Sequence, residues 1–160
     1  MSSEDLKRAL EKIVEPSSVH ARDYERNGCL LEIGAEPGQL PAIARAARDA
    51  GFFLEFITAV DFADGPVAVY QFNECETISR TQVKVQLARE ESLPSIGSVY
   101  DAALWYEREV FDLFGIRFDN HPDLRRLLLP EDADFHPLLK EYGKVHAFRS
   151  ARDIYDDQDA

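Results

Sequence analysis

WYEREVFDLFGIRFDNHPDLRRLLLP, residues 105–130, joins the end of a helix, a glycine, a short extended piece and a basic, leucine-rich turn in one run. Ser98, with Asp101 three positions later, is typical of a reciprocal N-terminal helix cap. Gly115 is typical of the left-handed residue that ends a helix. These signals predict a helix over residues 99–114, around which the domain is expected to be organised.

Glu107 is expected to face the core from the middle of this helix. At about 100° per residue, the apolar positions within about 60° of it are Tyr100, Ala103, Leu104, Val110, Phe111 and Phe114. A buried carboxylate costs several kcal/mol unless it is paired, so Glu107 needs a cationic or multi-donor partner. Arg125 and Arg126, which the turn at 120–122 carries back toward the helix, are the expected partners. The alternative is that Glu107 reaches solvent at a domain edge.

The other charges of the helix are predicted on its opposite side. Asp101, Arg108, Glu109 and Asp112 fall there, and Arg108 with Asp112 has the i,i+4 spacing of an ion pair. That side is expected to face water or a polar partner.

The composition limits the classes of protein to which the chain can belong. Its 160 residues, 45% of them hydrophobic, suffice for one domain with its own core. A formal net charge of −12 disfavours nucleic acids and anionic lipids as partners. Cys29 and Cys75 show no partner spacing, and no apolar leader or run of about 20 residues for a membrane span is visible. We therefore expect a cytoplasmic protein with reduced thiols that reaches a membrane only through a partner.

The remaining chain predicts an α+β domain. A helix is expected up to Pro16, and a turn of the Asn-Gly kind at 26–28 between two short strands. A second helix, from Pro37 to Gly51, is expected to direct inward Leu40, Ile43, Ala44 and Ala47. Further strands are expected at 52–60, 67–72 and 81–87. The fold class is α+β, with a small mixed, mostly antiparallel sheet and helices packed on one side.

Residues 1–130 are expected to form this domain, and residues 131–160 an extended C-terminal arm. The arm has no sustained hydrophobic period, so it is not expected to have a core of its own. It nevertheless carries large apolar side chains, at Phe135, Leu138, Leu139, Tyr142, Phe148 and Tyr155. We expect the arm to form an interface by lying over another subunit.

Motifs for chemistry in this chain are not recognisable. The histidines are not at metal-ligand spacings: His20, His121, His136 and His146. No glycine-rich phosphate loop or nucleophile elbow is present in the sequence. Glu107 and Glu109 point apart on a helix, which argues against a catalytic carboxylate pair. A stand-alone hydrolase that uses Glu107, Glu109 or His121 is kept as the alternative from a different class.

Two segments resemble a known family. YEREVFDLFGI at 106–116 and HPDLRRLLLP at 121–130 are similar to the signature of the 30-kDa subunit, also called the C subunit, of the respiratory NADH:quinone oxidoreductase, complex I. The resemblance covers roughly residues 51–142. The chain departs from the family pattern at Leu104, Asn120, Phe135 and Leu139. These departures leave the parent complex open.

The resemblance implies a non-catalytic structural subunit in the hydrophilic arm of such a complex, on the cytoplasmic side of the cell membrane. It implies that the chain braces the large hydrogenase-like subunit and the iron-sulfur small subunit. No cofactor is then expected in this chain, and iron-sulfur clusters and flavin, or a nickel-iron site, belong to partner subunits. The alternative parent is a membrane-bound energy-converting nickel-iron hydrogenase or a deazaflavin-dependent dehydrogenase.

The expected site is therefore structural and interfacial, with no catalytic, cofactor-binding or metal-binding residue. Its expected members are Glu107, Arg108, Glu109, Asp112, Gly115, His121, Pro122, Arg125, Arg126, His136 and Pro137.

Overall fold

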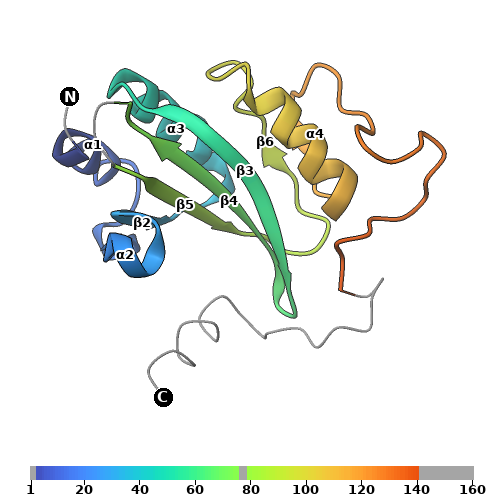
Figure 1. Cartoon of the computed structure of the whole chain (residues 1–160), viewed down its shortest axis with the longest axis horizontal. Helices are drawn as coiled ribbons and strands as arrows, with labels where there is room; N and C mark the ends of the chain where they lie inside the picture. Colours follow the sequence, from blue (N-terminus) through green and yellow to red (C-terminus); the bar gives the residue numbers. More distant parts are fainter. Residues whose placement is uncertain (1–2, 76–78, 141–160) are drawn as a thin grey trace.

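The computed structural model describes residues 3–75 and 79–140, and its centre is a five-stranded sheet (Figure 1). The strands are β1 (Val19–Ala21), β2 (Leu31–Gly34), β3 (Phe53–Phe62), β4 (Gly65–Asn73) and β5 (Thr81–Gln86), in the spatial order β1-β2-β5-β4-β3. The pairing of β2 with β5 is parallel and the other three pairings are antiparallel. The predicted mixed, mostly antiparallel sheet is confirmed.

The helices pack on one face of this sheet. They are α1 (Ser3–Leu10), α3 (Leu40–Asp49) and α4 (Ala103–Phe114), with the short helix α2 (Tyr24–Asn27) and the 3-10 turns η1 (Pro16–Ser18) and η2 (Pro37–Gln39) between elements. A small parallel pair, β6 (Leu93–Pro94) with β7 (Phe118–Asp119), brackets α4 in the sequence. Within the described residues, no helix is long and apolar enough to cross a bilayer.

The core forms because one side of each strand carries the apolar residues. In β5, Val83 and Val85 are buried and the intervening Gln82 and Lys84 are half-buried on the other face, as the alternation predicts. Ile57 of β3 and the strand residues beside it share one cluster with side chains of α1, α3 and α4. The four residues of α3 that were expected to point inward are all buried: Leu40, Ile43, Ala44 and Ala47.

The connection between β1 and β2 differs from the predicted two-residue turn. It contains α2, whose N-cap Asp23 accepts a hydrogen bond from the amide of Glu25 at 3.0 Å. Gly28, at φ 68°, ends α2 in the left-handed conformation. The two short strands are confirmed, but the Asn-Gly pair stops a helical turn here instead of forming a tight hairpin.

The start of α4 also differs from the prediction. The helix begins at Ala103, and Ala102 at its N-cap makes no side-chain cap hydrogen bond, so the predicted cap by Ser98 is wrong. Residues 98–102 form turns instead. Gly115, at φ 75°, ends the helix as predicted, and its amide donates to the carbonyl of Phe111 at 2.9 Å.

Gly65 in the β3–β4 turn offers a test of this hairpin. It has φ 122°, and a Cβ there would overlap the backbone carbonyl of Leu87, which cannot move without disturbing the end of β5. We expect Gly65→Ala to lower the free energy of unfolding by about 2–4 kcal/mol in chemical denaturation. Gly51 also has a positive φ, 85°, but no atom lies within 4 Å of its Cβ position, so Gly51→Ala should cost only about 1 kcal/mol. Equal losses for both would contradict the overlap.

Candidate functional site

Glu107 is fully buried in the middle of α4, as predicted. Its partners are not the expected arginines. The hydroxyl of Ser95 donates to Oε2 at 2.6 Å, and the amide of Ile96 donates to Oε1 at 2.8 Å. The prediction of Arg125 and Arg126 was wrong because the segment before the helix, and not the one after it, reaches this carboxylate.

Burial is the dominant influence on the ionisation of Glu107. Burial raises the pKa of Glu107, against the opposing effects of Ser95, the Ile96 amide and His121. His121 Nε2 lies 4.0 Å from Oε2 and 3.0 Å from the carbonyl of Leu104. Since Nδ1 accepts a hydrogen bond from the amide of Asp123, the proton of a neutral His121 is assigned to Nε2, which donates to Leu104.

Tyr70 of β4 belongs to the same buried neighbourhood. Its hydroxyl makes no hydrogen bond within the described residues. Burial, and next the charge of Glu107, raise the pKa of Tyr70 well above its ordinary value. The sequence argument missed both Tyr70 and Ser95, since neither lies near Glu107 in the chain.

Asp112 is the second fully buried acid of α4, and of the two predicted surroundings of this side, water or a polar partner, it has the polar partner. Its Oδ2 accepts hydrogen bonds from three consecutive amides, those of Leu127, Leu128 and Leu129, at 3.1, 2.7 and 3.0 Å. Arg126 Nη1 donates to Oδ1 at 3.0 Å. Burial alone would raise the pKa of Asp112, but these four donors outweigh it and lower the pKa to about 2.

Arg126 joins three parts of the chain. Its Nη1 lies 3.0 Å from the carbonyl of Asp112 and 3.0 Å from that of Phe135, and its Nη2 donates to the carbonyl of Ala133 at 2.6 Å. The guanidinium therefore links the end of α4 to the segment after Pro130. Its planar set of donors suits such multiple acceptors better than a lysine would.

Arg108 does not pair with Asp112 as predicted. Its Nε and Nη2 donate to the carbonyls of Arg125 and Arg126 at 3.2 and 2.8 Å. Its guanidinium also stacks on the ring of Trp105, 5.2 Å from the centroid. Residues 125–129 thus run along the side of α4 that turns away from the sheet, as the orange segment in Figure 1 shows.

The first ten residues of the predicted arm lie on the domain. His136 Nδ1 donates to the carbonyl of Asp112 at 2.9 Å, and its ring packs against Gly115 so closely that a Cβ there would lie 2.9 Å from the ring atom Cδ2. The amide of Leu138 donates to the carbonyl of Leu113 at 3.1 Å, and that of Lys140 donates to Asp61 Oδ2 at 3.0 Å. These contacts give hydrogen-bond donors to carbonyls at the C-terminal end of α4, which lack partners within the helix. Residues 141–160 of the arm lie outside the described residues.

Several expected site residues remain at the periphery. Arg125 is exposed and donates through Nε to Asp123 Oδ2 at 2.8 Å. Glu109 and Pro137 are half-buried, and Pro122 is exposed. The expected site residues that the structure brings together around the C-terminal half of α4 are Asp112, Arg108, Arg126, His136 and Gly115. Arg125, Glu109, Pro137 and Pro122 lie at the edge of this group.

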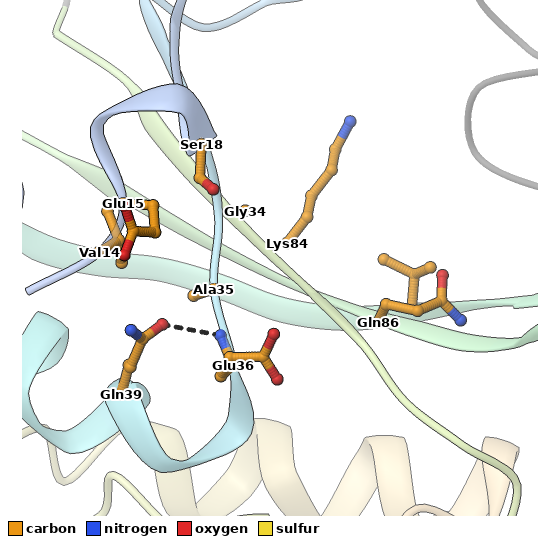
Figure 2. Close-up of a pocket in the computed structure, with 10 residues that line it drawn as sticks. Val14, Glu15, Ser18, Gly34, Ala35, Glu36, Gln39, Lys84 and Gln86 are labelled. Atoms are coloured by element: carbon orange, nitrogen blue, oxygen red, sulfur yellow. Dashed lines mark hydrogen bonds between the residues drawn. The ribbon is translucent and has the colours of Figure 1, made fainter.

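A hollow of about 360 Å³ lies away from α4, between the ends of β2 and β5 and the turn after α1 (Figure 2). Glu36 lines it, and its amide donates to Gln39 Oε1 at 2.8 Å. Lys84 also lines it but binds Glu32 Oε2 at 2.9 Å. In the described part of the chain, no group of three or more His, Cys, Asp or Glu side chains is placed to hold a metal ion.

Asp112→Asn tests the role of the buried carboxylate. Because its folded-state pKa is lowered from 3.8 to about 2, ionised Asp112 stabilises the fold above about pH 4, and this stability is lost as the pH falls toward 2. The shift corresponds to about 2 kcal/mol. We expect Asp112→Asn to be less stable than the wild type at pH 7, by about 3 kcal/mol, with the difference narrowing between pH 4 and pH 2 in urea unfolding.

The exposed Asp123 supplies the matched control, because its partner Arg125 is exposed as well. Asp123→Asn should leave both the stability and its pH profile nearly unchanged. A difference between wild type and Asp112→Asn that stays constant with pH would contradict the assigned charge of Asp112.

Glu107 should respond in the opposite sense to pH. Its folded-state pKa is raised, so the fold loses stability as the pH rises through that value, and Glu107→Gln should remove this dependence. Glu107→Ala leaves Ser95 and the Ile96 amide without their acceptor, and should cost about 3 kcal/mol. Glu107→Gln retains one acceptor oxygen and should cost about 1 kcal/mol. Unfolding curves at several pH values check both, and near-neutral effects of both would refute the buried pairing.

Comparisons with known proteins show the family to which the chain is related. A family model described as "Respiratory-chain NADH dehydrogenase, 30 Kd subunit" matches residues 33–147. The C subunit of the NADH-quinone oxidoreductase of Trichlorobacter lovleyi is 47% identical over 147 residues, which cover 86% of this chain and 90% of that protein. The fused C/D subunit of the NADH-quinone oxidoreductase of Methylococcus capsulatus is 46% identical over 81 residues, which cover 50% of this chain and 14% of that longer protein.

Two solved structures share the fold. The trypsin-resistant fragment of Nqo5 superposes with a TM-score of 0.59 at 28% identity, and covers 75% of this chain and 99% of the fragment. A chain of an archaeal respiratory membrane complex, the membrane-bound sulfane sulfur reductase, superposes with a TM-score of 0.71 over 98% of this chain and 91% of that chain. At 23% identity, this second likeness shows the fold alone.

Proposed function

The chain belongs to the family of the 30-kDa subunit of the respiratory-chain NADH dehydrogenase, and from that membership we propose that it is a structural subunit of a complex I-type NADH:quinone oxidoreductase. In this proposal it stands in the hydrophilic arm of the complex, on the cytoplasmic side of the cell membrane. It reaches the membrane only through other subunits, and electron transfer takes place in those subunits.

The use of the charged groups around α4 supports a structural role. Asp112 and Arg126 bind each other and the backbone of the segment that follows, and Arg108 binds carbonyls of the same segment. Glu107 holds the segment that precedes the helix. These side chains are engaged in fixing the shape of the domain, so they are not poised to bind a substrate. The engagement of these charged side chains within the domain is the main support for a structural role.

The fused relative supports a particular neighbour. In Methylococcus capsulatus a protein named as a C/D subunit contains the matched segment within one longer chain. Two units joined in one polypeptide are held at a high effective concentration, which suits units that work side by side. We propose that this chain contacts the large, hydrogenase-like D subunit, and that it also adjoins the iron-sulfur small subunit.

The C-terminal arm has a divided role in this proposal. Residues 131–140 complete the domain through His136, Leu138 and Lys140. Of the predicted arm, 131–160, the part proposed to form the interface is then residues 141–160, which lie outside the described residues.

Purification of the tagged chain from its native membranes tests the proposed function. We expect flavin, iron and NADH-oxidising activity to co-purify with it, while the isolated chain shows no visible absorption band. Co-purification of nickel without NADH oxidation would replace the proposed parent with a hydrogenase-type complex. Recovery as a lone protein with its own hydrolytic turnover, or as a brown, iron-bearing isolated chain, would overturn the structural role.

A deletion that keeps the described contacts of residues 131–140 tests assembly separately from folding. Deletion of residues 141–160 should leave the melting temperature of the domain nearly unchanged and reduce co-purification of the partner subunits. A truncated chain that assembles as well as the full chain would contradict the role of the arm and leave the rest of the proposal standing.

A further inference from the structure

Exposed apolar side chains are concentrated on α4 and the segment that covers it. Among the described residues, the large hydrophobic side chains with the greatest exposure are Leu128 at 65%, Trp105 at 61% and Leu138 at 50%. The two others, Phe53 and Val60 of β3, are 39% and 38% exposed. Full exposure of a tryptophan face is costly in water, and such residues mark contact sites when they stand together.

Trp105 and Leu128 lie on the same side of the domain. Trp105, Arg108 and Asp112 follow one side of α4 at i, i+3 and i+7, a distance of about 10 Å along the helix. Arg108 binds the carbonyls of residues 125–126, and Asp112 binds the amide of Leu128. The segment that carries Leu128 therefore runs beside the helix from Arg108 to Asp112, and Trp105 lies one turn before Arg108 on the same side. We call this the Trp105–Leu128 surface.

The Trp105 side chain and the backbone of Leu128 are both fixed within the domain itself. The indole of Trp105 rests against the guanidinium of Arg108, which is itself buried and fixed by two carbonyls. Leu128 is anchored through its amide to the buried carboxylate of Asp112. Anchors fixed in advance lose little conformational entropy on binding, and tryptophan is among the residues most often found at the energetic centre of an interface.

Charges at the edge of this surface select the kind of partner. Asp101, Asp123 and Glu131 are exposed around it, together with Arg125. This predominantly acidic rim adds to the formal charge of −12 of the whole chain. A partner that fits has an apolar pocket for an indole and a rim rich in lysine or arginine. Nucleic acid and anionic lipid lack both features.

We propose that the Trp105–Leu128 surface binds the large D subunit of the complex, with Trp105 inserted into an apolar pocket of that subunit. This inference rests on the proposed function and on the fused relative in which the C and D units share one chain. Trp105 is the principal anchor, Leu128 extends the apolar contact, and the acidic rim orients the two subunits.

The test uses the fact that Trp105 is the single tryptophan of the chain. The full chain labelled with 5-fluorotryptophan gives one fluorine NMR resonance, and unlabelled large subunit purified from the same organism is added to it. We expect this resonance to shift and broaden on binding. We expect Trp105→Ala and Leu128→Ser to weaken the complex at least about 10-fold in a direct affinity measurement.

Phe53→Ala and Val60→Ser are the matched controls, because these side chains are also exposed but lie on β3. They should change the affinity by less than about twofold. All four variants must keep the circular dichroism spectrum and melting temperature of the wild type, which their exposure permits.

The outcomes separate this inference from the proposed function. Wild-type binding that both Trp105→Ala and Leu128→Ser leave intact would overturn the proposed surface while the proposed function stands. Loss of affinity in the β3 variants instead would place the contact on the sheet and also overturn it. If the chain instead forms a homodimer that Trp105→Ala disrupts, the large subunit is not the partner of this surface. The same holds if the variant loses binding to the small subunit alone. Failure of the wild-type chain to bind any subunit would overturn the proposed function itself.

Discussion

The shape of the C-terminal half of this domain depends on one carboxylate, that of Asp112. It is fully buried, yet it stays ionised because three successive amides and one guanidinium donate to it. Three amides can converge on a single oxygen only if the backbone of residues 127–129 curves around it. The requirement to solvate one buried charge thus fixes the course of a segment that has no regular secondary structure of its own.

The pKa values of two acids five positions apart on α4 are shifted in opposite directions. Glu107 accepts two hydrogen bonds and lies 4.0 Å from His121, and burial raises its pKa. Asp112 has twice as many donors, one of them cationic, and its pKa falls. Each acid binds a different flanking segment, so the helix is connected on one side to the chain before it and on the other to the chain after it. A helix connected on both sides in this way suits the structural role proposed for this chain.

The sequence could predict what depends on local pattern. The β3–β4 hairpin followed from the strand patterns at 52–60 and 67–72, and the burial of Glu107 followed from helical phase. The partners of Glu107 could not be predicted, since Ser95 and Ile96 approach it through the tertiary fold. The sequence left open whether the side of α4 that carries Asp112 meets water or a polar partner. A single apolar stripe reveals the face toward the sheet, but it does not reveal that residues 127–129 bind the Asp112 carboxylate on the other face.

The position of β5 has a consequence for how the chain acquires its fold. This strand lies between β2 and β4, so the N-terminal strands have no place in the sheet until Thr81–Gln86 has been synthesised. On the ribosome, β1 and β2 must therefore wait, exposed or held by α1 and α3, while the β3–β4 hairpin forms from nearby residues. Parallel pairing across such a sequence distance closes slowly. In the completed sheet, β5 is the strand that joins the β1–β2 pair to the β3–β4 hairpin.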